Sequence, residues 1–290
     1  MKPAENTFFC RFFYFICIMK TLLFTLFFSV VTLVAHAQIS LAPTTVFADA
    51  NGIGTLYITN GSEKAQEVNL SFLFGYPGND SIGNLVMVYA DSLREQQSGL
   101  GDRIRTFPRS FILSPNQQQT VRFQIRPDRT KPDGMYFTRV KVSSNEQTAD
   151  IEEGATEGIA TTVNFKFEQV IAAFYKSGTV TTGLEFSKLE AHRKENSLSI
   201  DSDFKVIGNA PFLGSLQAVV KDTTGKTVAT HEQTIALYYE GKRNFTFDLP
   251  EGVASGDYQV ELVFKTERSD IATAELVQAP PFTKTLSIVL

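Results

Sequence analysis

Residues 161–178 read TTVNFKFEQVIAAFYKSG, and this stretch decides the fold class. In its first half, Val163, Phe165 and Phe167 alternate with polar residues. A period of two is typical of a β-strand with one apolar face. In its second half, the alternation stops and an unbroken apolar run extends from Val170 to Phe174. The stretch therefore predicts one strand whose leading apolar side chains face either their own core or another protein.

Alternating segments of the same kind recur along the chain, separated by turn residues such as Asn-Gly and Asp-Gly. The clearest are Val68–Phe74, Val121–Ile125, Tyr136–Val142, Leu216–Val220, Phe245–Leu249 and Tyr258–Phe264. Many short strands with closely spaced turns predict an all-β chain made of β-sandwiches. We place a domain boundary near residues 177–183, which gives an N-terminal domain at 38–177 and a C-terminal domain at 178–290.

The N-terminal segment has the pattern of a secretory signal peptide. Lys20 precedes the uncharged run TLLFTLFFSVVTLVA, and a small-residue A-x-A site follows at Ala35–Ala37. We therefore expect residues 1–37 to be removed after Ala37, with Met19 as an alternative start of translation. The competing interpretation is an N-terminal membrane anchor, although the run is short for a spanning helix. The sequence predicts an exported protein whose mature chain does not enter a membrane.

Composition argues against several function classes. The formal net charge is −4 and no basic stripe occurs, so we expect no nucleic-acid partner. Both cysteines, Cys10 and Cys17, lie in the predicted signal peptide, which leaves no thiol for a disulfide or a zinc site. The histidines of the mature chain, His192 and His231, stand in polar contexts, and no G-x-S-x-G motif occurs. We predict a protein that is not an enzyme and that needs no metal or cofactor.

Two segments lack a clear period. Residues 75–108 are long for a loop between strands, which indicates a functional or a disordered segment. Residues 143–162 are acidic and contain no apolar period before Ile159, so they are expected to form a mobile connector.

The order of several motifs resembles the periplasmic pilus chaperones of the chaperone–usher pathway. ISLAPTTVFAD at 39–49 is similar to the opening strand of that family. FPRSFILSPNQQQTVRFQIRP at 107–127 is similar to its proline–strand–turn–strand signature, with Arg122 as the arginine of the next strand. KPDGMYFTRVKV at 131–142 and FYK at 174–176 resemble the strands that follow. The resemblance covers residues 39–175 well and the second domain in outline.

The resemblance implies a fold and a function. In this family, two immunoglobulin-like domains form an L or boomerang, and a pilus subunit that lacks its last strand binds the edge of the first domain. The chaperone lends its closing strand, a process called donor-strand complementation. An outer-membrane usher then receives the complex. The resemblance thus implies a periplasmic chaperone for pilus or fimbrial subunits, with a subunit and an usher as partners and no cofactor.

Carried over residue by residue, the donor positions are Val163, Phe165 and Phe167, with Ile171 further along in the same register. Each large apolar side chain moved from water into a groove of the subunit contributes roughly 1.5–3 kcal/mol. The alternative is that these residues face their own core, as in any sandwich strand. An exposed apolar edge of this kind would also permit self-association of the free protein.

The chain departs from the family at the carboxylate anchor. The best-known members hold the C-terminal carboxylate of the subunit with two basic residues in the cleft between the domains, and those positions are Thr45 and Ala172 here. Arg103, Arg105 and Arg109 are candidate substitutes, because an arginine fork matches a carboxylate. The departure points to a divergent branch of the family, similar to the archaic type.

Two other classes of function remain open at this stage. One is an exported structural or adhesive surface protein built from two sandwiches. The other is an exported carbohydrate- or peptide-binding module, which the absence of Trp disfavours because Trp is a common platform for sugars.

Overall fold

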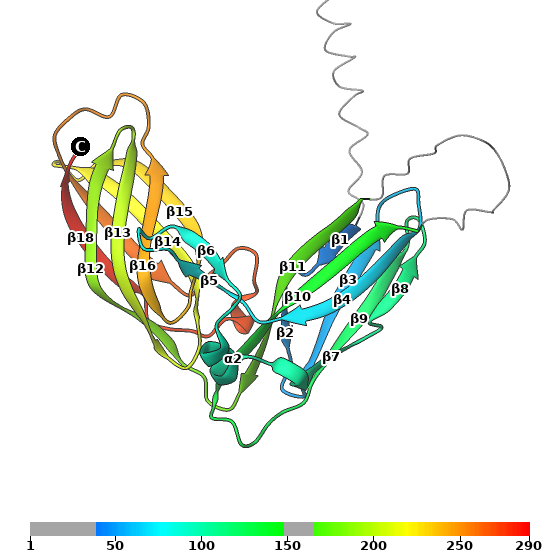
Figure 1. Ribbon diagram of the computed structural model, residues 1–290. Coiled ribbons are helices and arrows are strands. Elements are labelled where there is room, and N and C mark those ends of the chain that lie inside the picture. Colours follow the sequence, from blue (N-terminus) through cyan, green and yellow to red (C-terminus); the bar gives the residue numbers. More distant parts are fainter. Residues whose placement is uncertain (1–38, 148–164) are drawn as a thin grey trace, which may run out of the picture.

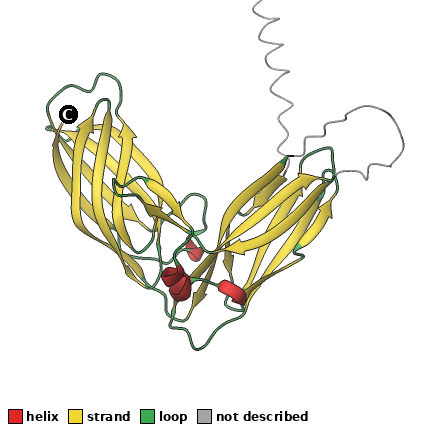
Figure 2. Ribbon diagram, in the orientation of Figure 1, coloured by secondary structure: helices red, strands yellow, loops and turns green. Residues whose placement is uncertain are grey.

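The computed structural model describes residues 39–147 and 165–290, which form two β-sandwiches set at an angle to each other like the arms of a V (Figure 1). Strands dominate both arms, and the few helical turns lie near the base of the V (Figure 2). The predicted all-β class with two sandwiches in an angled arrangement is confirmed. The predicted signal peptide, with its two cysteines, lies outside the described residues.

The first sandwich packs a sheet of strand order β1-β3-β9-β7 against a sheet of order β2-β11-β10-β4-β8. The strands are β1 (Ile39–Ala42), β2 (Thr45–Ala48), β3 (Ile53–Asn60), β4 (Gln66–Leu73), β7 (Ile104–Phe107), β8 (Ser110–Leu113), β9 (Gln118–Ile125), β10 (Gly134–Glu146) and β11 (Lys166–Ser177). The opening segment switches sheets, because β1 pairs with β3 while β2 pairs in parallel with β11.

The second sandwich packs the sheet β12-β13-β16 against the sheet β15-β14-β17-β18. The strands are β12 (Thr182–Lys194), β13 (Ser197–Gly208), β14 (Phe212–Asp222), β15 (Thr227–Leu237), β16 (Glu240–Asp248), β17 (Asp257–Lys265) and β18 (Phe282–Val289), and a 3-10 turn, η3 (Thr273–Glu275), precedes β18. The chain passes from the first sandwich to the second between β11 and β12. The exact limits of the domains stay a prediction.

The alternating segments supply the two cores. Along β9, Val121, Phe123 and Ile125 are almost fully buried and the residues between them are exposed or half-buried. Along β17, Val260, Leu262 and Phe264 are fully buried in the second core. Because side chains of a strand point alternately to its two faces, the period of two in the sequence places one apolar face inside each sandwich.

The segment 75–108 is not an irregular loop. It contains the hairpin strands β5 (Tyr76–Asn79) and β6 (Leu85–Val88), the helix α2 (Ser92–Ser98), the turn η2 (Gly101–Arg103) and the strand β7. Asp91 caps α2 by accepting a hydrogen bond from the backbone N–H of Arg94 at 3.0 Å. The predicted connector at 143–162 is also wrong in its first residues, because β10 continues to Glu146, while residues 148–164 lie outside the described part.

The hairpin β5–β6 belongs to the first sandwich in sequence but lies against β15 and β16 of the second (Figure 1). The backbone N–H of Asn244 donates to the carbonyl of Gly83 at 2.9 Å, which ties the tip of the hairpin to β16. Arg94 adds an ion pair to Glu240 at 2.7 Å and stacks over the ring of Tyr239 at 4.0 Å. The hairpin thereby covers one open side of the second sandwich.

A third apolar cluster, which contains residues of both sandwiches, fills the base of the V. Its members are Phe74, Tyr76, Met135, Phe137, Ala172, Phe174, Ala210, Leu213, Tyr238, Ile271 and Leu276. The rings of Phe137 and Tyr238 meet edge to face at 4.9 Å across the junction. This cluster buries the second half of β11 and fixes its position between the two sandwiches.

Candidate functional site

The outer edge of β11 is only partly paired. On one side β11 pairs with β10 from Lys166 to Ser177, but on the other side β2 pairs only with Ala172–Tyr175. Among the described residues, no strand pairs with the outer edge between Lys166 and Ile171. The side chain of Gln169 donates to the carbonyl of Ile39 at 2.9 Å, the one side-chain bond recorded from this stretch to β1 in the described part of the chain. Unpaired backbone N–H and C=O groups of this kind form a template for another strand.

Two aromatic side chains are exposed at this open edge. Phe165 retains 65% of its surface and Phe167 retains 44%. Large apolar side chains exposed beside an open strand edge are unusual in a monomeric protein, and they mark interaction sites. Val163, the third residue of the predicted set, lies outside the described residues.

Ile171 differs from the two phenylalanines. It shares their alternation but is 8% exposed and packs in the first core together with Ala173 and Tyr175. A side chain that already fills its own core is not free to fill the groove of a partner. Ile171 is therefore not a donor residue as the sequence predicted. On this face of β11, the change from exposed to buried side chains occurs between Phe167 and Ile171.

The opposite face of the leading half of β11 is polar. Glu168 forms ion pairs with Lys166 at 3.0 Å and Lys141 at 3.3 Å. The hydrogen bond from Lys166 and then that from Lys141 lower the pKa of the Glu168 carboxyl. These charges keep the first part of this face in water, whereas Val170, two residues after Glu168 on the same face, is apolar and 43% exposed.

The two family anchor positions lie side by side. Thr45 on β2 is the register partner of Ala172 on β11, and Ala172 is in turn the partner of Arg139 on β10. The three residues form one row across the sheet, with neighbouring strands about 4.8 Å apart. A cation is therefore present one strand beyond the position where the resemblance implied a basic residue.

A cleft of about 240 Å³ opens beside this row. The cleft is lined by residues of the first sandwich, Thr45, Arg139, Val170 and Ala172, and by Arg268 of the second sandwich. Pro77 of the hairpin also lines it. The cleft thus joins the open edge of β11 to both arms of the V.

The two arginines of the cleft differ in how far their charge is matched. Arg268 donates to both carboxylate oxygens of Asp270, at 2.9 and 2.6 Å, and this contact lowers the pKa of the Asp270 carboxyl. Arg139 donates its Nε to the carbonyl of Gly75 at 2.9 Å and, within residues 39–147 and 165–290, has no ion pair with a carboxylate. Burial raises the pKa of the neighbouring Tyr238 to about 12. Arg139 is therefore the better-placed group for an incoming carboxylate.

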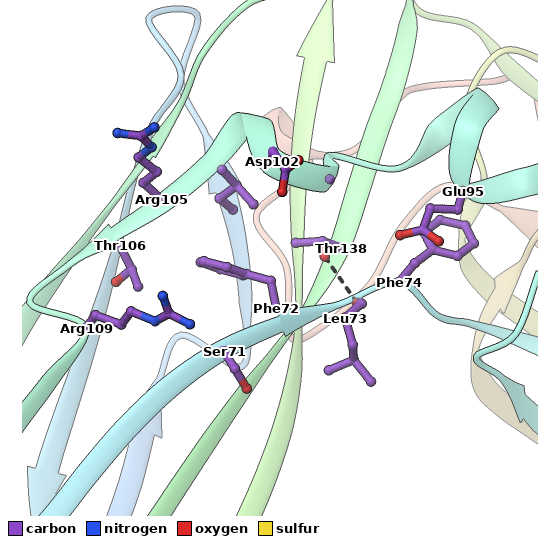
Figure 3. A pocket seen from close by; sticks show the side chains of 12 residues that line it. Ser71, Phe72, Leu73, Phe74, Glu95, Asp102, Arg105, Thr106, Arg109 and Thr138 are labelled. Carbon is purple, nitrogen blue, oxygen red and sulfur yellow. Dashed lines mark hydrogen bonds between the residues drawn. The ribbon is translucent and has the colours of Figure 1, made fainter. Parts of the chain in front are cut away.

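The three arginines predicted as substitutes are elsewhere. Arg105 and Arg109 line a groove of about 660 Å³ along β4 and β7 (Figure 3). The Nε of Arg109 lies 3.4 Å from the carbonyl of Leu70 on β4. Because β4 is three strands from β2 in the sheet, this groove is roughly 14 Å from Thr45, although Leu73, which lines it, is the register partner of Arg139.

Arg103 has a structural contact instead. Its guanidinium donates to the carbonyl of Gly99 at 3.1 Å and lies over the ring of Tyr136 at 4.5 Å. The structure therefore brings none of the three predicted arginines to Thr45 and Ala172. The sequence analysis did not identify Arg139, although the sequence contained a signal. Met135 and Phe137 lie on the same strand face as Arg139 and are apolar, which indicates that another part of the protein packs on this face. Arg139 would then lie at the edge of that packed region.

Within the described residues, no three His, Cys, Asp or Glu side chains are grouped as a metal site would require. None of the helices described is both long and apolar enough to cross a membrane.

No protein-family model and no curated protein sequence matches this chain. Several solved structures do, among them the YadV chaperone, with a TM-score of 0.44 and 10% identity over 86% of this chain and 100% of that chain. A chain of the CsuC–CsuE chaperone–tip adhesion subunit complex from the archaic Csu pili of Acinetobacter baumannii matches with a TM-score of 0.42 and 10% identity, over 87% and 98%. A chain of the Salmonella enterica SafA pilin–SafB chaperone complex matches with a TM-score of 0.40 and 15% identity, over 87% and 97%. Two of these structures contain a chaperone in complex with a pilus subunit, the class of protein that the motifs of the sequence resemble.

Proposed function

We propose that this protein is a periplasmic chaperone for pilus or fimbrial subunits, which it binds by adding its β11 edge to an incomplete subunit and hands to an outer-membrane usher. The observation that carries the proposal is the open edge at Lys166–Ile171 with Phe165 and Phe167 exposed beside it. In two solved structures to which this chain is similar, a chaperone is in complex with a pilin or a tip adhesion subunit. Export by the predicted signal peptide is part of the same proposal.

The physical basis is strand addition. Backbone hydrogen bonds between β11 and a subunit strand would supply affinity, and the two phenylalanines would fill the apolar core that the subunit leaves incomplete. Each ring that becomes fully buried contributes roughly 1.5–3 kcal/mol, which must exceed the cost of ordering both chains. No small molecule, metal or nucleotide takes part in such a step.

Arg139 is the residue we assign to the carboxylate of the subunit. It lies in the same sheet row as Thr45 and Ala172, where the family has its basic residues, and it borders the cleft. A charge-assisted hydrogen bond from a guanidinium to a chain-terminal carboxylate would set the register of the added strand. This assignment replaces Arg103, Arg105 and Arg109.

The test is a pull-down of the tagged, full-length protein from its own periplasm, with the recovered polypeptides identified by mass spectrometry. We expect one small exported β-protein in near-stoichiometric amount with the unsubstituted protein. The Phe165→Asp/Phe167→Asp variant should remain folded and lose that partner. Ile112→Asp is the matched control, because Ile112 is 56% exposed on β8 at the other end of the same sheet.

Two results would contradict the proposal. One is recovery of the same partners, in the same amounts, with the folded β11 variant. The other is recovery of no exported subunit at all, which would favour an exported structural or adhesive sandwich protein. Self-association through β11 would appear in the same experiment as recovery of untagged copies of the chain.

A further inference from the structure

The β5–β6 hairpin is a rigid part of the molecule. Its strands pair antiparallel from Tyr76 opposite Val88 to Asn79 opposite Leu85. At the turn, the Asp80 carboxylate accepts hydrogen bonds from the backbone N–H groups of Ile82 and Asn84 at 3.0 and 2.9 Å. The hairpin therefore presents its side chains in fixed positions.

One face of the hairpin continues the wall of the cleft. Pro77 lines the cleft together with Val170 and Ala172, and Met87 is the direct partner of Pro77 across the hairpin. Directly paired residues point to the same face of a sheet, about 5 Å apart. Leu85, two residues before Met87, shares that face.

This face is apolar and uncovered. Leu85 is 55% exposed and Met87 is 42% exposed, and the strand LVMV that carries them has no charge. In the described part of the chain, β6 pairs only with β5, so its outer edge is also unpaired. Exposed apolar residues on an unpaired strand are a liability unless a partner covers them.

We propose that Leu85 and Met87 form a second contact surface for the same subunit that adds to β11. This inference rests on the proposed function and names a further part of its binding surface. Continuity identifies the occupant: Val170, which is 43% exposed beside the open edge, and Pro77 of the hairpin line one cleft. Figure 1 places the hairpin on the other arm of the V, so a subunit seated on β11 would have the hairpin as its neighbour.

The first test uses photocrosslinking. Met87→Cys and, separately, Phe167→Cys are labelled with a benzophenone maleimide and irradiated in periplasmic extract, with Ile112→Cys and the unsubstituted protein as controls. We expect Met87 and Phe167 to crosslink to the same polypeptide, identified by mass spectrometry, and the controls to give none. The unsubstituted protein also reports any labelling of the native cysteines.

The second test measures capture. Leu85→Thr/Met87→Thr introduces β-branched side chains, which suit a strand, but removes most of the apolar surface of this face. We expect recovery of the crosslinked polypeptide to fall about tenfold. Ile112→Thr/Val289→Thr is the matched control, because both residues are exposed on strands away from the cleft. It should recover the polypeptide like the unsubstituted protein.

The outcomes separate this inference from the proposed function. A subunit that crosslinks to Phe167 but not to Met87 would overturn the second surface and leave the chaperone role intact. A second copy of the chain or a different polypeptide on Met87 would also overturn it. No crosslink at either position would contradict both proposals.

Discussion

The two sandwiches leave their strand edges in different states. In the second sandwich, β12 and β18 lie against each other on one side, and the β5–β6 hairpin covers β15 and β16 on the other. In the first sandwich, the outer edge of β11 from Lys166 to Ile171 has no strand beside it among the described residues. Uncovered strand edges promote aggregation. Because the β5–β6 hairpin covers the second sandwich while the edge of β11 stays unpaired, we infer that a partner strand binds to β11.

The comparison is tested most strongly by placing a carboxylate at buried and at exposed positions of β11 and measuring the free energy of unfolding. Ile171→Asp buries a carboxylate in the first core and should cost about 4 kcal/mol or more of unfolding free energy. Phe165→Asp/Phe167→Asp should change it by about 1 kcal/mol or less, because both rings face solvent. Urea denaturation followed by circular dichroism measures both. Equal destabilisation would mean that the phenylalanines belong to the core.

Loosening the β5–β6 hairpin, which covers β15 and β16 of the second sandwich, should cause the next largest loss of unfolding free energy. Tyr76 is 9% exposed, and its hydroxyl donates a hydrogen bond to Asp91 at 2.7 Å. Its ring stacks on that of Tyr238 at 5.8 Å and meets that of Tyr239 edge to face at 5.0 Å. Tyr76→Ala should cost about 3 kcal/mol, whereas Tyr76→Phe keeps the ring and should cost about 1 kcal/mol. The difference in urea midpoint between the two variants reports the packing of the hairpin. Identical midpoints would show that the hairpin is held loosely.

The unfolding free energy of the region around Tyr238, beneath the hairpin, should also fall at alkaline pH. Burial raises the pKa of Tyr238 to about 12, above the value of 10.0 expected in the unfolded chain. Its contribution to stability is therefore complete below pH 10 and is lost as the pH rises from 10 to 12. By pH 11 the loss amounts to about 1 kcal/mol. Tyr238→Phe should lose about that much less than the unsubstituted protein between pH 9 and pH 11, measured by urea denaturation. An equal loss in both would place the effect elsewhere.

The sequence predicted the fold class because alternation reports which strand face is apolar. It did not predict which apolar residues are covered: Phe167 and Ile171 share one period, yet only Ile171 meets its own core. Burial depends on the strands of the opposing sheet, and those contacts are distant in the chain. Periodicity alone therefore identified the strand, but it did not show at which residue the exposed side chains give way to buried ones.

The hairpin and the cleft escaped prediction for related reasons. The strands of the hairpin, YPGN and LVMV, are four residues each, too short for a period to emerge, and one contains Pro and Gly. Arg139 reaches the cleft because β10 places it beside Ala172, a pairing of residues far apart in sequence. Arg103, Arg105 and Arg109 were close to a motif in the sequence, but the sheet order separates them from the cleft.

Hydrogen exchange at the open edge tests the central claim most directly. The amides of the peptide spanning residues 165–171 are followed by mass spectrometry in the free protein and in its complex with the polypeptide recovered in the pull-down. We predict that the amides of this stretch that point to the open edge exchange rapidly in the free protein and become protected in the complex. The amides bonded to β10, and residues 172–175, already paired with β2, stay protected in both. Unchanged exchange at 165–171 on complex formation would contradict strand addition at β11.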